Sequence, residues 1–371
     1  MLPPDVQPTR DTNPAGPSGA SSFSGNSESK RYTVQEVIGK GSYGVVCGAI
    51  DNLTGERVAI KKIRIAFDNL AEATRILREI KLLRLLKHAD VVDVKHIILP
   101  SNPQSFKHVF VVFERMESDL HTVIQSNDDL DHHHHKVFLY QLLRGLNFIH
   151  ASGVLHRDLK PRNILANSTC KLKICDFGLA RPFIPDNAMS PVFWTDYVAT
   201  RWYRAPELCG RFYGHYCQAV DIWSVGCIFA EVLLGTPLFK GSDAMNQLQL
   251  ITDLLGKPPP AVIDGISDVK ARTFLAALPP KQPRDLADKF PSAHPAALAM
   301  LRRLLSFDPL DRPTAARALE DPYFDELREA TEQEPAMDVA AHFGFERSRL
   351  NEHEIRALIY QEVCDHGPEE S

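Results

Sequence analysis

Hydrophobic positions are almost missing from the start of the chain and then return in short, regular runs. Residues 1–30 are dominated by Pro, Gly, Ser, Asn and Thr, so burial of apolar side chains cannot offset the entropy cost of ordering. We therefore predict that this tail is disordered. After it, the runs YTVQEVIG, VVCGAID and ERVAIKKI are separated by Gly-rich or Asn-Leu-Thr-Gly turns, a spacing typical of an antiparallel meander.

A helix and two further strands complete this first unit. Residues 70–87 show strong helical periodicity, and the runs VVDVKHIIL and HVFVVFE that follow are of strand length. The pattern then changes to a period of 3.6 in VFLYQLLRGLNFIHASG, DIWSVGCIFAEVLLG, QLQLITDLLG and ALAMLRRLLSFD. This periodicity predicts a larger, mostly helical unit. The expected fold class is α+β.

The boundaries of the units follow from the same pattern. We expect a β-rich unit with one main helix over residues 31–115 and a helical unit over residues 116–325, with a Pro-rich, mixed insert near residues 240–295. Residues 326–371 form an acidic, weakly patterned extension that ends in the short helix NEHEIRALIYQEV. The sequence contains no internal repeat.

Composition argues against several classes of protein. A formal net charge of -5 without a basic block does not suit a protein that grips nucleic acid, because backbone phosphates require a concentrated basic face. The seven cysteines form no CxxC pair, which favours reduced thiols over a disulfide framework. The longest apolar runs are of strand length, and the start MLPPDVQPTRDT has no signal-peptide pattern. We expect a cytoplasmic and nuclear protein that binds neither nucleic acid nor membrane.

The first candidate for chemistry is a glycine-rich turn. Gly39, Gly41 and Gly44 lie in GKGSYGVV between two predicted strands, where a turn without side chains allows backbone N–H groups to close over phosphates. A plain β-turn is the alternative. Because the turn precedes a strand and does not open a helix, dinucleotide binding is not favoured.

A lysine on the third predicted strand strengthens the phosphate interpretation. Lys61 in VAIK would extend toward the α- and β-phosphates of a nucleotide. Glu79 in TRILREIKLL is the candidate counter-charge. Two simpler interpretations stay open here: Lys61 as an ordinary surface lysine, and Glu79 as an i,i+4 partner of Arg75 within its own helix.

Later motifs supply the remaining parts of a phosphoryl-transfer site. HRDLKPRN places Asp158, Lys160 and Asn163 in one short loop. They provide a carboxylate for the substrate hydroxyl, an ammonium for the γ-phosphate and an amide for a metal ion. DFG follows the run KLKIC and supplies Asp176 as the main Mg²⁺ ligand. With APE closing the segment, the order of the motifs is too specific to arise by chance.

On these motifs, residues 31–325 resemble the protein kinase family. The resemblance implies a two-lobed fold, ATP as co-substrate and Mg²⁺ as cofactor. It also implies an ion pair of Glu207 with Arg312 and a role for Asp221 in bracing the catalytic loop. Phe113 would be the gatekeeper and residues 114–116 the hinge that binds adenine. The positions assigned to the nucleotide site are Ile38, Gly39, Gly41, Gly44, Val46, Ala59, Lys61, Glu79, Phe113, Glu114, Met116, Asn163 and Asp176.

The segment between DFG and APE narrows the resemblance. Lys160 is the form seen in serine/threonine kinases, and FWTDYVATRWYRAPE resembles the Thr-x-Tyr lip of mitogen-activated protein kinases, in the Thr-Asp-Tyr variant of a plant and green-algal subgroup. This implies a proline-directed signalling kinase that is activated by phosphorylation of Thr195 and Tyr197. Its partners would be ATP, proteins with Ser-Pro or Thr-Pro sites, phosphatases, and an upstream mitogen-activated protein kinase kinase unless it phosphorylates itself.

The same resemblance assigns phosphate-binding and docking residues. FGFERSRLNEHEIRALIYQEV resembles a C-terminal extension that packs back on the small lobe. Glu329 and Glu332 stand where the family has two aspartates that dock basic peptides, which leaves docking of the usual kind in doubt. The implied phosphate-binding arginines are Arg75, Arg78, Arg157 and Arg181 for phosphothreonine, and Arg201 and Arg204 for phosphotyrosine.

Three other interpretations have to be weighed. A pseudokinase that acts as a scaffold would be expected to lack Lys61, Asp158 or Asp176, all of which are present. A cyclin-dependent-type kinase would carry a PSTAIRE-like helix, which TRILREI does not match. The four histidines at residues 132–135 stand at a predicted helix start and fan out around its axis, so a solvated helix end is favoured over a metal site.

Overall fold

The computed structural model describes the chain in several stretches. The described residues are 31–41, 44–98, 100, 102–126, 130–183, 201–209, 217–328 and 337–365. The tail predicted to be disordered lies outside them, as do Thr195, Tyr197, Glu329 and Glu332.

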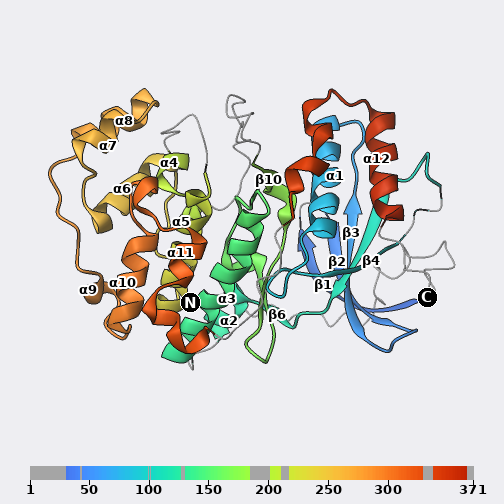
Figure 1. The fold of residues 1–371 in the computed structure, drawn as a ribbon, viewed down its shortest axis with the longest axis horizontal. Helices are drawn as coiled ribbons and strands as arrows, with labels where there is room; N and C mark the ends of the chain where they lie inside the picture. Colours follow the sequence, from blue (N-terminus) through green and yellow to red (C-terminus); the bar gives the residue numbers. More distant parts are fainter. Residues whose placement is uncertain are drawn as a thin grey trace, which may run out of the picture.

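An antiparallel sheet forms the first lobe (Figure 1). Lys61 stands at its centre, opposite Val46 on one neighbouring strand and Val111 on the other. The Asn-Leu-Thr-Gly turn works as predicted, since Gly55 has a positive φ of 74° that favours glycine. In the spatial order of the sheet, the strands are β1 (Tyr32–Gly41), β2 (Gly44–Asp51), β3 (Arg57–Arg64), β5 (His108–Glu114) and β4 (Val94–Ile98).

Helix α1 (Leu70–Leu85) is the main helix of this lobe. It begins after Asn69, whose side chain accepts a hydrogen bond from the backbone N–H of Glu72 at 3.2 Å. It ends two residues earlier than the periodicity predicted. The helix also buries two charged side chains, Arg78 and Glu79, and buried charges require partners.

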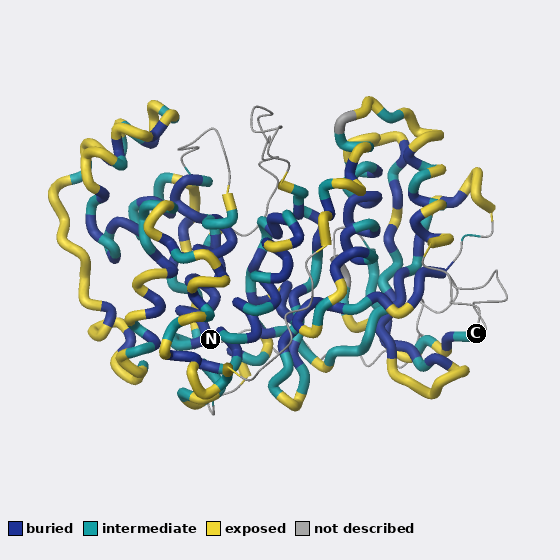
Figure 2. The backbone as a smooth tube through the Cα atoms, viewed as in Figure 1, coloured by how far each residue is buried: buried dark blue, intermediate teal, exposed yellow. Residues whose placement is uncertain are grey.

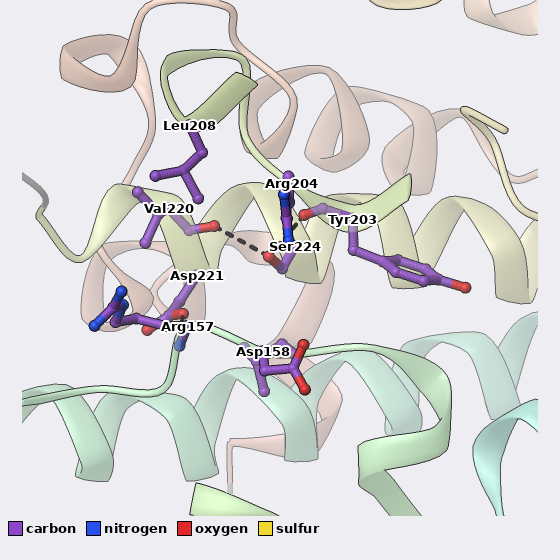
Figure 3. A pocket seen from close by; sticks show the side chains of 9 residues that line it. Arg157, Asp158, Tyr203, Arg204, Leu208, Val220, Asp221 and Ser224 are labelled. Atoms are coloured by element: carbon purple, nitrogen blue, oxygen red, sulfur yellow. Dashed lines mark hydrogen bonds between the residues drawn. The ribbon is translucent and has the colours of Figure 1, made fainter. Parts of the chain in front are cut away.

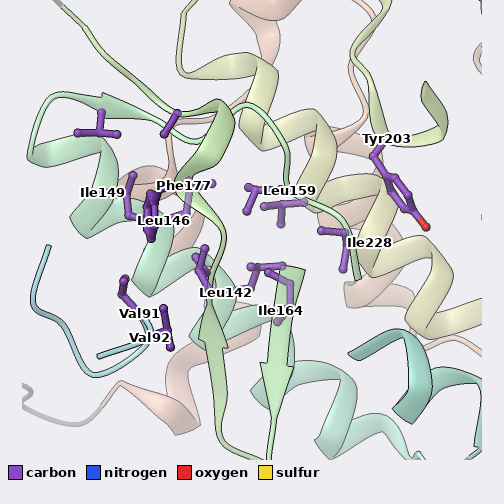
Figure 4. Packing of buried hydrophobic residues seen from close by; sticks show 14 of the residues in the cluster. Val91, Val92, Leu142, Leu146, Ile149, Leu159, Ile164, Phe177, Tyr203 and Ile228 are labelled. Atoms are coloured by element: carbon purple, nitrogen blue, oxygen red, sulfur yellow. The ribbon is translucent and has the colours of Figure 1, made fainter. Parts of the chain in front are cut away.

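The second lobe is built around α5 (Ala219–Leu234), which is mostly apolar and almost entirely buried (Figure 2). Figure 4 shows part of this core, where Leu146 and Ile149 lie beside Phe177 of the DFG motif. The predicted α+β organisation, a β-rich unit followed by a helical unit, is confirmed. The other long or core helices are α2 (Leu120–Ser126), α3 (His132–Ala151), α4 (Pro206–Cys209), α6 (Ala244–Leu255), α10 (Pro295–Leu304) and α11 (Ala315–Leu319).

Short helices form in the Pro-rich insert, where the sequence pattern predicted none. They are α7 (Pro260–Asp264), α8 (Val269–Ala277) and α9 (Leu286–Lys289). Asp268 and Asp285 cap the last two with side-chain hydrogen bonds to backbone N–H groups. Across the described stretches, no helix is long and apolar enough to cross a membrane.

The C-terminal segment returns to the first lobe. Helix α12 (Glu352–Cys364) lies alongside α1 (Figure 1), and its Ile355, Ile359 and Val363 are fully buried. Two 3₁₀ turns, η9 (Val339–His342) and η10 (Gly344–Arg347), precede it. A segment more than 250 residues away in sequence therefore covers the helix that carries Glu79.

Candidate active site

Lys61 and Glu79 form the ion pair that the sequence suggested. Lys61 Nζ lies 2.6 Å from Glu79 Oε1, and Glu79 is 3% exposed. Glu79 is therefore more than a surface partner of Arg75, and Lys61 is not an ordinary surface lysine. Burial would lower the pKa of Lys61, but the charges of Glu79 and Asp176 outweigh burial and raise it. The ammonium stays charged in a fixed place, as phosphate binding requires.

The catalytic loop gathers its side chains around one carboxylate. Lys160 Nζ lies 2.6 Å from Asp158 Oδ2. Asn163 Nδ2 donates to the same oxygen at 3.0 Å and to the backbone carbonyl of Asp158 at 2.8 Å. The loop ends in the short turn η3 (Pro161–Asn163), which brings Asn163 back toward Asp158. The structure thus brings together the three residues that the sequence motif proposed.

Asp176 lies beside this loop in strained backbone. Its φ of 67° and ψ of 75° belong to the left-handed region, which is costly for residues other than glycine and is often found at functional sites. Burial would raise the pKa of the Asp176 carboxyl. The charges of Lys61, His156 and Lys160 outweigh burial and lower that pKa, so the carboxylate is ionised at neutral pH.

Asp176 and Asn163 offer the oxygen donors that Mg²⁺ prefers. Because Nδ2 of Asn163 is engaged with Asp158, Oδ1 is the amide atom that could bind a cation. Within the described stretches, no three His, Cys, Asp or Glu side chains gather into a metal site of their own. One or two protein oxygens, completed by water and substrate phosphates, is the usual arrangement for Mg²⁺, and these residues fit it.

Asp221 braces the catalytic loop from α5 (Figure 3). Its buried carboxylate accepts the backbone N–H of Arg157 at 2.7 Å and that of His156 at 2.9 Å, and it lies 2.9 Å from Nε2 of His150. Arg157 has a positive φ of 69°, so these bonds hold a strained turn. That turn directly precedes Asp158, whose position therefore depends on Asp221.

The glycine-rich turn lies where β1 ends and β2 begins. Gly41 pairs with Gly44, and Gly39 pairs with Val46, which in turn stands opposite Lys61. A Cβ at Gly44 would lie 1.8 Å from the carbonyl oxygen of Lys62, so no side chain fits there. Nearby, Ile38 is an exposed apolar residue of β1.

The expected hinge follows β5. Phe113 pairs with Ala59 of β3 and is half-buried. Glu114 accepts the backbone N–H of Asp93 at 3.0 Å, and its Oε1 lies 2.5 Å from Lys173 Nζ in the second lobe. The hinge is thus tied to both lobes just before Met116.

Comparison with known proteins places this site in a family. A model of the protein kinase domain matches residues 32–324. The chain is similar to mitogen-activated protein kinases 15 and 8 of Arabidopsis thaliana, at 58% identity over 94% of this chain and 60% and 59% of their lengths. It is 56% identical to mitogen-activated protein kinase 15 of rice (Oryza sativa subsp. japonica), over 93% of this chain and 70% of that protein. The chain belongs to the mitogen-activated protein kinases.

Membership of this family can be compared with what the sequence predicted. The kinase spans about three fifths of the length of the two Arabidopsis relatives. Its two-lobed fold is confirmed by the matched domain and by the element order. The alternatives of a cyclin-dependent-type kinase and of an inactive scaffold are not favoured, because the relatives are named mitogen-activated protein kinases.

A cleft opens in this kinase next to the carboxylate of Asp158 (Figure 3). Tyr203 and Arg204 contribute to it from the segment before APE. Leu208 and Val220 give it an apolar wall, and Ser224 donates to the carbonyl oxygen of Tyr203 at 2.9 Å. The remaining lining residues are Arg157, Asp158, Leu159 and Asp221.

The arginines that were predicted to bind phosphate come together only in part. Burial and the nearby charges of Arg78, Arg157 and Arg75 lower the pKa of Arg181 to about 9, so these four side chains form one cationic cluster. Arg201 instead donates to the carbonyl oxygen of Ser242 at 2.8 Å, and Arg204 lines the cleft. Their predicted phosphate ligands, Thr195 and Tyr197, lie outside the described residues.

Glu207 and Arg312 form the expected buried pair. Arg312 Nη1 and Nη2 donate to the two carboxylate oxygens of Glu207 at 2.7 and 2.8 Å. The guanidinium also lies 5.0 Å from the ring of Trp223 on α5. The pair therefore joins the APE segment to the core of the second lobe.

The four-histidine run is less solvated than predicted. Only His133 is exposed, while His132 stacks on His294 with ring centroids 4.4 Å apart. His134 forms a capping box with Asp131 at the start of α3. The run is a packed helix start, because the insert and the end of the second lobe supply neighbours that the local pattern cannot reveal.

Sequence reasoning missed two supporting contacts. Tyr203 donates to Glu231 Oε2 at 2.6 Å in a fully buried setting, and burial raises the pKa of Glu231 even though this hydrogen bond opposes the shift. Arg78 pairs with Glu346 of the C-terminal extension. A charged residue within an apolar run could have indicated such contacts, and Glu231 in IFAEVLL is the clearest case.

Proposed function

We propose that this kinase transfers the γ-phosphoryl group of ATP, with Mg²⁺, to serine or threonine hydroxyls of proteins. The observation that carries the proposal is the convergence of two charged assemblies, Lys61 with Glu79 and Asp158 with Lys160 and Asn163. Asp176 connects them, because the charges of Lys61 and Lys160 both lower the pKa of its carboxyl group. Phosphoryl transfer depends on positioning and charge compensation, which these residues supply.

Each residue has a role that follows from its contacts. Lys61, fixed by Glu79, would bind the α- and β-phosphates. Asp158 would orient the acceptor hydroxyl and receive its proton, and Lys160, 2.6 Å from Asp158, would offset charge on the γ-phosphate. Asn163 and Asp176 would hold Mg²⁺, which compensates charge on the transferring group when bound.

The cleft beside Asp158 supports a proposal on the substrate class. Its apolar wall at Leu208 and Val220 suits a proline that follows the acceptor residue. Proline has no N–H that such a wall would leave unsatisfied. We propose a preference for Ser-Pro and Thr-Pro sites.

Regulation is proposed to act through the lip. Phosphates on Thr195 and Tyr197 would each add about 1.5 to 2 negative charges and three acceptor oxygens. The cluster of Arg78, Arg157 and Arg181 could bind the first of them. An upstream kinase or the protein itself would add the phosphates, phosphatases would remove them, and the protein would act in the cytoplasm and nucleus without binding nucleic acid or membrane.

The test is phosphate transfer to two matched peptides that differ in Pro or Ala after the acceptor serine. Wild type should phosphorylate the Pro peptide ~5- to 150-fold faster, since an amide N–H buried without a partner costs about 1–3 kcal/mol. Asp176→Asn and Asp158→Asn should lose nearly all transfer while keeping the thermal midpoint of wild type. Asp285→Asn, an exposed helix cap, is the control that should stay active. Appreciable activity of Asp176→Asn at ordinary Mg²⁺ would contradict the metal assignment.

A further inference from the structure

Arg78 is held by a carboxylate that lies outside the catalytic motifs. It stands on α1 next to Glu79 and is buried. Its Nη2 donates to Glu346 Oε2 at 3.0 Å, and its Nε donates to Glu346 Oε1. This two-pronged geometry fixes the direction of the guanidinium as well as its distance.

Glu346 is itself firmly placed. It lies in η10 directly after Phe345, which packs against the same core as the fully buried Phe343 that precedes this turn. The Glu346 side chain is 19% exposed and that of Arg78 is 5% exposed. Loss of one partner from so enclosed a pair leaves an uncompensated buried charge, which is strongly destabilising for the local arrangement.

The electrostatic setting explains why a carboxylate is needed there. Arg78 shares a cationic cluster with Arg75, Arg157 and Arg181. Glu346 is a neighbouring charge that opposes this repulsion, since it raises the pKa of Arg181 where the arginines lower it. Without a negative group, repulsion would push α1 away from the catalytic loop.

We propose that Glu346 is a positioning residue that holds α1, and with it Glu79 against Lys61, while Thr195 carries no phosphate. The inference rests on the proposed function. Glu346 occupies Nε and Nη2 of Arg78, and Nη1 has no hydrogen-bond partner among the described residues. A phosphate could therefore bind Arg78 at Nη1 without displacing Glu346, and it would hold α1 even where Glu346 is removed.

The test compares Glu346→Gln with wild type, each prepared without lip phosphate and with both lip phosphates. Glu352→Gln is the matched control, because Glu352 pairs with Arg356 inside α12 and not with α1. We expect Glu346→Gln to lower kcat of the unphosphorylated enzyme ~10-fold, because Arg78 loses its charge-assisted partner. The phosphorylated enzyme should lose less than ~3-fold, and Glu346→Asp, which keeps the charge, should recover part of the loss.

A second readout does not depend on catalysis. Amide hydrogen exchange of α1 should become faster in unphosphorylated Glu346→Gln and stay unchanged in Glu352→Gln. Equal losses of kcat in both phosphorylation states, unchanged kcat and exchange, or a gain in basal rate would each overturn the proposal. If wild type transferred no phosphate, the proposed function would fail, and α1 exchange would still decide whether Glu346 holds the helix.

Discussion

Replacement of Asp221 by asparagine probes how the catalytic loop is held. The carboxylate is fully buried and accepts backbone N–H groups of His156 and Arg157, with His150 Nε2 also at 2.9 Å. Asparagine has the same shape but offers one oxygen and one NH₂ group. One of the two backbone N–H groups must then face a donor, so a bond is lost and a buried donor is left unsatisfied.

The expected cost can be worked from these contacts. A hydrogen bond to a charged group contributes about 1.5–3 kcal/mol, and removal of the buried charge returns part of its desolvation cost. The net loss should be about 2–4 kcal/mol, which lowers the thermal midpoint by roughly 4–16 °C for a lobe of this size. Arg157 sits at a φ of 69°, a strain of about 1–3 kcal/mol, so its turn should relax once the bond is weakened.

Activity should fall as well, because Asp158 follows the turn that Asp221 holds. Relaxation of the turn displaces Asp158, and a misplacement of about 1 Å can cost ~100-fold in rate. We expect kcat to fall ~10- to 100-fold at a temperature where the variant is folded, with the KM for ATP changed less than ~3-fold because Lys61 is untouched. Asp243→Asn, an exposed cap of α6, is the control. An Asp221→Asn enzyme with the kcat and thermal midpoint of wild type would refute the bracing argument.

Two further predictions concern the lip and the core. Thr195→Ala and Tyr197→Phe should each lose most of the activation that phosphorylation gives, and Arg157→Ala should resemble Thr195→Ala; variants that match fully phosphorylated wild type in rate would exclude the switch. Tyr203→Phe should lower stability by about 1.5–3 kcal/mol, because it removes a donor from the buried Glu231 carboxylate. Glu231→Gln, which keeps an acceptor and removes the charge, should cost less, and a thermal scan of both variants compares them.

Local pattern predicted the elements that carry the chemistry. The strands and α1 depend on local signals: alternation, helical periodicity, and caps such as Asn69. These signals lie within a few residues of each element, so the sequence predicts the element. The sequence left three possibilities open: Lys61 paired with Glu79, Lys61 as a surface lysine, or Glu79 paired with Arg75. The choice depends on how α1 packs against the sheet. Burial of Glu79 decides it, and burial is a tertiary property.

Other features have no local signal. The insert helices are short and held by caps and a small separate core of Leu248, Ile263 and Leu275, so periodicity over a long window misses them. His132 is covered by His294 from a distant helix. Glu346 lies 268 residues beyond Arg78, and a glutamate in a weakly patterned extension looks like any solvated charge.

Three carboxylates, two buried and one partly buried, hold separate elements of the site in the same way. Asp221 holds the catalytic loop, Glu207 holds the APE segment through Arg312, and Glu346 holds α1 through Arg78. In each case a carboxylate engages donors at two points, and loss of one partner from such an enclosed set is costly, so the geometry resists small displacements. Asp221 and Glu207 lie within the matched kinase domain, residues 32–324, and Glu346 lies beyond it. The placement of Glu79 in this kinase therefore depends on a segment that the catalytic motifs do not include.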